Sequence, residues 1–277
     1  MERLSKAIER ARAERLARGT VKPDATPRSR TRATAERTGA DTAWLAMEEL
    51  EFDSKLLFQN RVMTVKAGQD SAPFDLLRTR LVQTARQNSW RRIAIVSPHK
   101  ACGKSTTCAN LAFSMARQRD LKSMVLDCDL RKRGLTRIFG QEPAAGTAEM
   151  LQGSVDIADV GRRFGDNLIM CFADRSTGSP SEILQSSSAR AALDNIQRTY
   201  QPDIMIFDMP PLMASDDNFG FLQNVDAALI LVAAEMTTNS QIDVAERQVA
   251  DLTNVMGIVL NRCRYTDGAY GHEYGYY

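Results

Sequence analysis

The chain has 277 residues, 43% of them hydrophobic, and a formal net charge of +2. Single α/β domains commonly reach ~200–250 residues, so we expect one such domain with appendages, and the small net charge gives no sign of a nucleic-acid partner. The 5 cysteines form no CxxC pair and only 2 histidines are present, which argues against a zinc site and predicts reduced thiols in a cytosolic protein.

The first 42 residues are basic and differ in composition from the rest of the chain. Residues 1–18 predict a charged helix with a narrow apolar stripe, which is either a solvated helix or a docking helix for a partner. Residues 19–42 carry Gly, Pro, Ser, Thr and Arg without periodicity and predict a flexible linker. We therefore divide the chain into this basic segment (1–42), a globular domain (43–264) and a C-terminal tail (265–277).

Apolar residues return at Trp44, where the chain is expected to begin packing onto the domain. A helix is expected to start at Pro73, because the fixed φ of proline and its missing N–H suit a first helical turn. Apolar side chains fall on one side of this helix, and its arginines are expected to be exposed. These arginines are Arg78, Arg80 and Arg86.

From residue 92 onward, near-continuous apolar strands alternate with helical segments. This pattern is typical of a parallel sheet that is buried on both faces. The predicted strands cover 92–97, 123–128, 167–171, 203–208, 227–233 and 256–261, and the predicted helices cover 104–118, 181–198 and 240–252. We predict an α/β fold with a mostly parallel central sheet flanked by helices on both faces, and a ligand site at the carboxyl ends of its strands.

The turn after the first of these strands predicts a phosphate site. An apolar run over 93–96 leads through a short polar turn into Gly103-Lys104-Ser105-Thr106 and then into a helical pattern. At a helix N-terminus the backbone N–H groups attract an anion, the lysine reaches the outer phosphates and the serine can bind Mg²⁺. Pro98 and Ala101 stand where glycine is common in such loops. The alternative interpretation is a chance Gly-Lys-Ser in a surface turn. The residues expected to contact nucleotide are Lys100, Ala101, Cys102, Gly103, Lys104, Ser105 and Thr106.

Acidic residues end two further predicted strands. Asp127 and Asp129 lie two positions apart as one strand finishes, so an extended backbone points both to the same side. Asp208 ends another strand and is followed by two prolines. A single aspartate at a strand end is more often a turn residue or a cap. Three of them at one edge of a sheet with a phosphate loop favour metal binding or catalysis, and Ser105 and Asp208 are the expected Mg²⁺ ligands.

Together these motifs resemble those of a known family. Gly103-Lys104-Ser105-Thr106, Asp127-x-Asp129-x-Arg131 and Asp208-x-Pro210-Pro211 resemble the Walker A, A′ and B motifs of bacterial tyrosine kinases, P-loop enzymes that regulate exopolysaccharide and capsule synthesis. The resemblance covers about residues 60–277 and includes the Pro-Ser-Glu-Ile-Leu segment at 180–184. It implies a P-loop NTPase fold and a protein-tyrosine kinase that uses ATP and Mg²⁺ and phosphorylates tyrosines in its own tail.

The resemblance also implies a role for each residue of the motifs. Lys104 would bind the β- and γ-phosphates, and Ser105 and Asp208 would hold Mg²⁺. Asp127 and Asp129 would be the catalytic carboxylates. One of them would position the metal shell, and the other would accept the proton of the tyrosine hydroxyl.

Two further positions carry roles implied by the resemblance, and two depart from it. Arg131 would add positive charge near the phosphates. Asn261 resembles the adenine-contacting asparagine of related ATPases, although a cap at a strand end explains it equally well. The oligomer-forming helix of the family has Glu and Arg where this chain has Ala72 and Asp75, while Leu77-Arg78-Thr79 is retained. These departures concern ring assembly rather than nucleotide binding.

The chain ends in a tyrosine-rich tail. Five of its 6 tyrosines fall in the last thirteen residues, separated mostly by small or polar residues. Such a segment cannot bury a core, and by itself it is more typical of a sticky low-complexity tail than of a substrate. Behind a kinase-like domain it is expected to be the substrate, with phosphoacceptors Tyr265, Tyr270, Tyr274, Tyr276 and Tyr277.

The partners and location follow from the resemblance. The N-terminus has no signal-peptide pattern, and the longest apolar run, 227–234, is far shorter than the ~20 residues of a membrane helix. The resemblance implies a cytoplasmic protein held peripherally at the inner membrane by a membrane-spanning modulator of polysaccharide export, and a homo-oligomer in the unphosphorylated state. Two alternatives remain, which are a partitioning ATPase of the ParA/MinD kind and a weakly active nucleotide-binding scaffold for a polysaccharide transporter.

Overall fold

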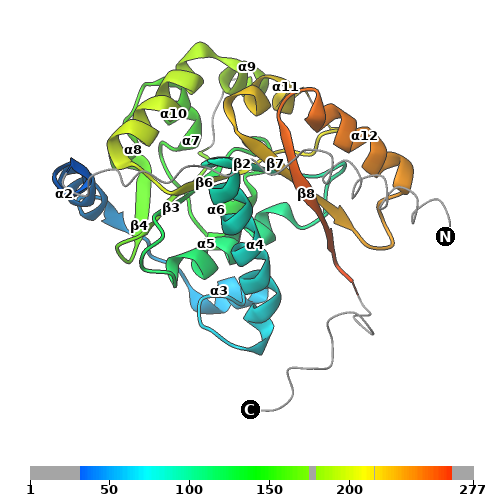
Figure 1. Ribbon diagram of the computed structural model, residues 1–277, viewed down its shortest axis with the longest axis horizontal. Helices are drawn as coiled ribbons and strands as arrows, with labels where there is room; N and C mark the ends of the chain where they lie inside the picture. The colour runs from blue at the N-terminus through cyan, green and yellow to red at the C-terminus, as the bar shows by residue number, and fades with distance from the viewer. Residues whose placement is uncertain (1–31, 175–178, 215, 264–277) are drawn as a thin grey trace, which may run out of the picture. The chain divides into compact units, whose positions relative to one another are not determined.

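The computed structural model describes residues 32–174, 179–214 and 216–263 (Figure 1). The predicted helix 1–18 and the tyrosines of the tail lie outside these residues. The centre of the fold is an eight-stranded sheet with the order β1-β4-β5-β3-β6-β2-β7-β8. The strands are β1 Glu48–Glu49, β2 Arg92–Val96, β3 Ser123–Asp127, β4 Gly161–Phe164, β5 Leu168–Cys171, β6 Ile204–Asp208, β7 Ala227–Ala233 and β8 Asn254–Asn261.

The sheet is mostly parallel, as predicted. Six of its seven strand pairs are parallel, and only β4 and β5 pair antiparallel. Strands β1 and β4 were not predicted from the sequence. They are short strands, with β1 at the edge of the sheet and β4 next to it, in which Glu48 and Glu49 pair with Arg162 and Arg163, so no apolar run marks them. Between these two strands, ion pairs take the place of buried apolar side chains.

Helices cover both faces of the sheet (Figure 1). They are α2 Arg32–Leu45, α3 Ser54–Gln59, α4 Ala72–Asn88, α5 Lys104–Ala116, α6 Gly134–Phe139, α7 Thr147–Gln152, α8 Ile157–Val160, α9 Pro180–Gln185, α10 Ser187–Tyr200, α11 Asp217–Phe221 and α12 Asn239–Ala250, with short 3₁₀ turns η1 Gln69–Ser71 and η2 Leu222–Asn224. Because successive side chains of a strand point to opposite faces, the interior divides into two apolar clusters. In β2, Ala94 and Val96 join the cluster under α7, α10 and α12, whereas Ile93 and Ile95 join the cluster under α4, α5 and α6. None of the helices in the described residues is long and apolar enough to cross a membrane.

Two predicted segments differ from the structure. The segment predicted as the flexible linker 19–42 is helical from Arg32 onward, because α2 extends to Leu45. The end of α2 is anchored by Trp44, which is 1% exposed and donates from Nε1 to the carbonyl of Tyr200 at 2.8 Å. The predicted helix 181–198 is two helices, since Ser186 has an extended backbone, ends α9 and caps α10 by accepting from the N–H of Ala189 at 3.1 Å.

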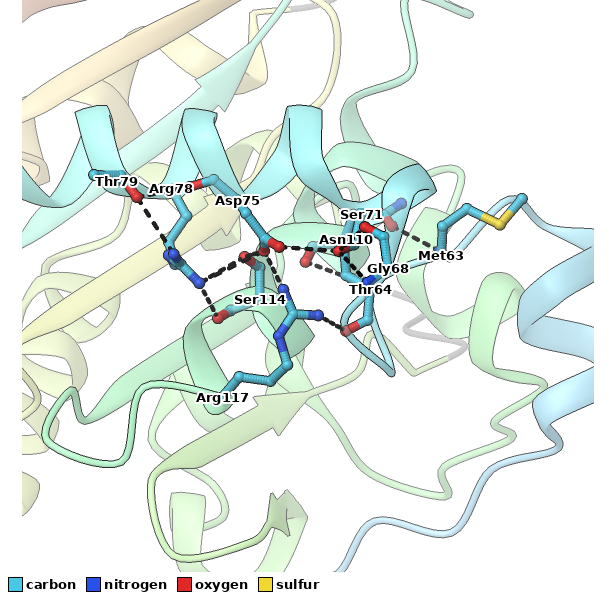
Figure 2. A network of polar contacts seen from close by, with 10 residues as sticks. All are labelled: Met63, Thr64, Gly68, Ser71, Asp75, Arg78, Thr79, Asn110, Ser114 and Arg117. Carbon is cyan, nitrogen blue, oxygen red and sulfur yellow. Dashed lines mark hydrogen bonds and ion pairs between the residues drawn. The ribbon is translucent and has the colours of Figure 1, made fainter. Parts of the chain in front are cut away.

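A polar network fastens α4 to α5, the helix that follows the phosphate loop (Figure 2). The carboxylate of Asp75 accepts from the hydroxyls of Ser71 and Ser114 and from the guanidinium of Arg117. Arg78 donates to the carbonyl of Ser114 at 2.9 Å, so its side chain is half-buried rather than exposed as predicted. Burial lowers the pKa of Arg78 from its ordinary value, and Asp75 opposes this change.

The same face of α5 also binds residues 61–64, which precede α4 in the sequence. Asn110 is fully buried, and its side chain accepts from the N–H of Met63 at 2.8 Å and donates to the carbonyl of Arg61 at 2.9 Å. The hydroxyl of Thr64 donates to the carbonyl of Asn110 at 2.7 Å. Asp75 therefore contributes to contacts within this chain. The network positions the helix whose first residue is Lys104.

Candidate nucleotide-binding site

The phosphate loop joins β2 to α5 at the carboxyl edge of the sheet. It turns through two left-handed residues, Ala101 with φ 65° and Gly103 with φ 94°. The second must be glycine, because a Cβ there would stand 2.3 Å from the amide nitrogen of Asn261. At Ala101 the left-handed conformation costs roughly 1–2 kcal/mol for a residue with a side chain. The loop therefore keeps the backbone turn that glycine usually supplies, in spite of the substitution.

Lys104 is the first residue of α5 and lies folded against the strand end. It is 6% exposed, and its Nζ donates to the hydroxyl of Ser97 at 3.0 Å. Ser97 in turn donates to the carbonyl of His99 at 2.7 Å. Cys102, one of the predicted nucleotide contacts, is fully buried and does not line the cavity at this site.

Asp127 and Asp208 are directly paired residues at the ends of the neighbouring strands β3 and β6. Both are 0% exposed. One oxygen of Asp127 accepts from the N–H and the hydroxyl of Thr136, each at 3.0 Å. The other oxygen of Asp127 and both oxygens of Asp208 have no hydrogen-bond partner within the described residues. Buried carboxylate oxygens normally have a partner, so these three are suited to a cation or to its water ligands.

Ser105 completes this group from the start of α5. A Cβ at Gly134 would lie 2.0 Å from the Ser105 hydroxyl oxygen and 3.4 Å from Asp208 Oδ2, so the first residue of α6 lies against both side chains. Sequence reasoning missed Gly134, because nothing in the local pattern distinguishes it from a turn glycine. Within the described residues, no three carboxylate, thiol or imidazole groups converge on a metal position. The residues nevertheless fit Mg²⁺, which is commonly bound by one or two carboxylates together with phosphate oxygens and water.

Burial raises the pKa values of both carboxyls, and a neighbouring carboxylate adds to the change in each, namely Asp208 for Asp127 and Asp129 for Asp208. The pKa of Asp208 is raised to about 7, first by burial, while Lys104 and then Ser105 oppose the change. The pKa of Asp127 is raised well above its ordinary value by burial and then by the charge of Asp208. A cation placed between the two would favour the ionised form of each.

The loop after β3 brings Asp129 and Arg131 to the same edge. Asp129 is 6% exposed and accepts from the N–H of Lys132 at 3.0 Å. Arg131 makes two parallel hydrogen bonds to Asp217, from Nε at 2.7 Å and from Nη2 at 2.9 Å, and these bonds raise its pKa. Asp217 is 1% exposed and was not predicted. The only sequence signal for it is the acidic pair Asp216-Asp217 shortly after the two prolines that follow Asp208.

A cavity of about 760 Å³ lies at this edge, and Lys104, Ser105, Asp129 and Arg131 line it, whereas Asp127 and Asp208 do not. This volume is within the range of small-molecule sites. Most of its charged residues are basic, which suits an anionic ligand. The lining residues are Asn60, Lys100, Ala101, Gly103, Lys104, Ser105, Thr106, Asp129, Arg131, Lys132, Gly134, Arg137, Ile138, Pro210, Pro211 and Ala214.

Asn261 lies at the end of β8 against the phosphate loop. Its Nδ2 donates to the carbonyl of Cys102 at 2.9 Å, and its Oδ1 accepts from the N–H of Arg262 at 2.8 Å. The adenine contact suggested for this residue stays a prediction. What the structure shows is a side chain that braces the loop.

Comparison with known proteins agrees with this arrangement. The family described as the CobQ/CobB/MinD/ParA nucleotide binding domain matches residues 93–273, which is more than half of the chain. The chain belongs to this family. The match begins in β2 and includes the phosphate loop and the three strand-end aspartates.

Individual relatives agree with the resemblance found in the motifs. Tyrosine-protein kinase YwqD of Bacillus subtilis is 28% identical over 218 residues, covering 78% of this chain and 89% of the relative. Tyrosine-protein kinase CpsD of Streptococcus pneumoniae is 27% identical over 182 residues, covering 65% of this chain and 79% of the relative. The resemblance to bacterial tyrosine kinases is thereby confirmed.

Solved structures confirm the fold. The kinase domain of Escherichia coli tyrosine kinase ETK superposes with a TM-score of 0.65 at 23% identity, covering 76% of this chain and 82% of that chain. The chimerical protein CapA2B2 superposes with a TM-score of 0.65 at 22% identity, covering 78% and 93%. At these identities the likeness concerns the P-loop fold alone.

Proposed function

We propose that this chain is an ATP- and Mg²⁺-dependent protein-tyrosine kinase that phosphorylates the tyrosine cluster at its own C-terminus. The observation that carries the proposal is a group of three buried oxygens of Asp127 and Asp208, near Lys104, that have no hydrogen-bond partner in the part of the chain that the structure describes. The kinship with named tyrosine kinases supports the choice of acceptor, as does the concentration of five tyrosines in the last thirteen residues.

In this proposal Lys104 exchanges Ser97 for the outer phosphates of ATP, and the backbone N–H groups at the start of α5 bind the phosphate oxygens. Ser105 and Asp208 would hold Mg²⁺, and Asp127 would orient its water ligands. When bound, Mg²⁺ would supply positive charge beside the phosphates. Catalysis here is mostly positioning and charge neutralisation, because phosphoryl transfer needs little covalent chemistry from the protein.

The proton of the acceptor requires a base. A tyrosine hydroxyl has a pKa of ~10, so a carboxylate that accepts its proton accelerates the reaction at neutral pH. Asp129 is the candidate for this base, because it lines the cavity whereas Asp127 is fully buried and bonded to Thr136. Arg131 lines the same cavity and supplies positive charge there, held by Asp217.

We infer the cellular role from the resemblance. A kinase of this kind would regulate exopolysaccharide or capsule synthesis and export, bound peripherally at the inner membrane through a membrane-spanning partner. The unphosphorylated form would be a homo-oligomer in which one copy presents its tail to another. The basic N-terminal segment 1–42 is a candidate for the partner contact.

Incubation of the purified chain with ATP and Mg²⁺, followed by detection of phosphotyrosine and of released phosphate, tests the proposal. We expect phosphotyrosine in the full chain and none in a Lys104→Met variant or in a chain that ends at residue 264. Released phosphate without phosphotyrosine would instead indicate a partitioning-type ATPase. ATP binding without either product would indicate a scaffold.

A further inference from the structure

The outer side of the phosphate loop is held by the end of β8. Two consecutive loop carbonyls are bonded there: Arg262 Nη1 donates to the carbonyl of Ala101 at 3.0 Å, and Asn261 Nδ2 donates to the carbonyl of Cys102 at 2.9 Å. A carbonyl turned toward a bound phosphate would repel it. Holding these two oxygens on the outer side leaves the loop N–H groups for the anion.

The two bracing residues are themselves fixed. The carbonyl of Asn261 accepts from the N–H of Ala234 at 2.9 Å, and its side-chain oxygen accepts from the N–H of Arg262 at 2.8 Å. Arg262 has a left-handed backbone with φ 62°, and its Nη1 lies 3.4 Å from the sulfur of Met236. The loop packs closely against Asn261, because a Cβ at Gly103 would stand 2.3 Å from the amide nitrogen of Asn261.

The contact from Arg262 is made at the strained residue of the loop, Ala101. Ala101 holds φ 65°, a conformation that glycine adopts freely and alanine does not. The guanidinium of Arg262 is always charged and makes a charge-assisted hydrogen bond to the carbonyl of that same residue. The strained residue and its charged partner therefore form one unit.

We propose that Arg262, with Asn261, is a positioning residue that holds the phosphate loop in its anion-binding conformation and takes over the role of the missing glycine at position 101. The proposal rests on the nucleotide site proposed above. It assigns a function to a residue that lies outside all three motifs, shortly before the tyrosine-rich segment in the sequence.

The consequence for the reaction is specific. Loss of the brace should weaken nucleotide binding about tenfold, the usual effect of removing a hydrogen bond from a charged donor. It should raise KM for ATP while leaving kcat at saturating ATP within about twofold, because the bonded groups do not touch the transferring phosphoryl group. Arg262→Lys should not restore affinity, since an ammonium lacks the planar fork of guanidinium.

The test is calorimetric titration of Mg·ADP into the full chain and its variants. Arg262→Ala should bind about tenfold more weakly than the wild type, with an unchanged melting temperature in the absence of nucleotide. Arg247→Ala is the matched control, because Arg247 is an exposed arginine of α12 whose guanidinium donates within its own helix, to the carbonyl of Asp243 at 3.1 Å. It should bind like the wild type.

The double variant Ala101→Gly, Arg262→Ala decides the mechanism. Glycine adopts the left-handed turn without a brace, so affinity should return to near the wild-type value. Wild-type affinity in Arg262→Ala, with binding lost in Lys104→Met, would overturn the inference and leave the nucleotide site standing. A double variant as weak as Arg262→Ala would also overturn it. Absence of Mg·ADP binding by the wild type would overturn the proposed function and the inference with it.

Discussion

Gly134→Ala provides a stringent structural test of the metal site, because the change adds one methyl group and no charge. The new Cβ would stand 2.0 Å from the hydroxyl oxygen of Ser105 and 2.8 Å from its Cβ, whereas real contacts of this kind begin at about 3.0 Å. The methyl and the hydroxyl must therefore separate by at least 1 Å. Movement of Gly134 is restricted, since α6 is tied to Asp127 through Thr136.

The displaced group is the proposed Mg²⁺ ligand Ser105. A misplacement of ~1 Å at a reacting centre can lower the rate ~100-fold. We expect a loss of that order in tail phosphorylation at limiting Mg²⁺ and partial recovery at high Mg²⁺. Overpacking of this size destabilises folds by ~1–3 kcal/mol, so rates should be measured well below the melting temperature of the variant.

The assay is initial-rate phosphotyrosine formation across a Mg²⁺ titration at saturating ATP. Gly39→Ala serves as the control, since a Cβ there has nothing within 4 Å, and it should follow the wild-type curve. An unchanged Mg²⁺ requirement in Gly134→Ala would refute the placement of Mg²⁺ between Ser105 and Asp208.

Three further predictions concern the acids, the loop and the tail. Asp129→Asn should keep ATP binding by calorimetry but lose phosphotyrosine formation, and wild-type activity would remove Asp129 as the base. Because the pKa of Asp208 is raised to about 7 from an unfolded value near 4, its contribution to stability is present at low pH and is lost as the pH rises through 7. The melting temperature without nucleotide should fall between pH 5 and 8, and Asp208→Asn should flatten that dependence. Identical pH dependence in the variant and the wild type would contradict the raised pKa of Asp208. Each phosphotyrosine in residues 265–277 adds about −1.5 to −2 charges, so phosphorylation should release a self-associated form in light scattering, and equal mass before and after phosphorylation would refute this.

The fold could be predicted from the sequence wherever burial on both faces leaves a continuous apolar run. All six predicted strands are found, since each carries such a run. The edge strand β1 and its neighbour β4 were missed because the pairing between them involves Glu and Arg side chains from distant segments. The start of α2 at Arg32 was missed because the helix carries no regular apolar period, and it is anchored near its end by the buried Ala40 and Trp44 and by the ion pair of Asp41 with Lys122.

The site residues that belong to a recognisable sequence motif could be predicted. Lys104, Ser105 and the three aspartates lie at one edge of the sheet, as the strand ends required. Residues that act through tertiary contact carry no local signal: Asp217 meets Arg131 from a separate helix, and Arg262 meets Ala101 from the end of the last strand. The sequence also does not show which charged residues of a helix have a partner. Arg78, for example, was expected to be exposed but is half-buried beside Asp75.

The central claim is that this P-loop site transfers phosphate to the tyrosines of its own chain. Mapping phosphorylated residues by tandem mass spectrometry after incubation with ATP and Mg²⁺ tests it most directly. The account predicts phosphate on tyrosines of residues 265–277 and none on Tyr200, which is 5% exposed in the core, with all modification absent from Lys104→Met. An unmodified tail in wild-type protein that nevertheless hydrolyses ATP would contradict the claim.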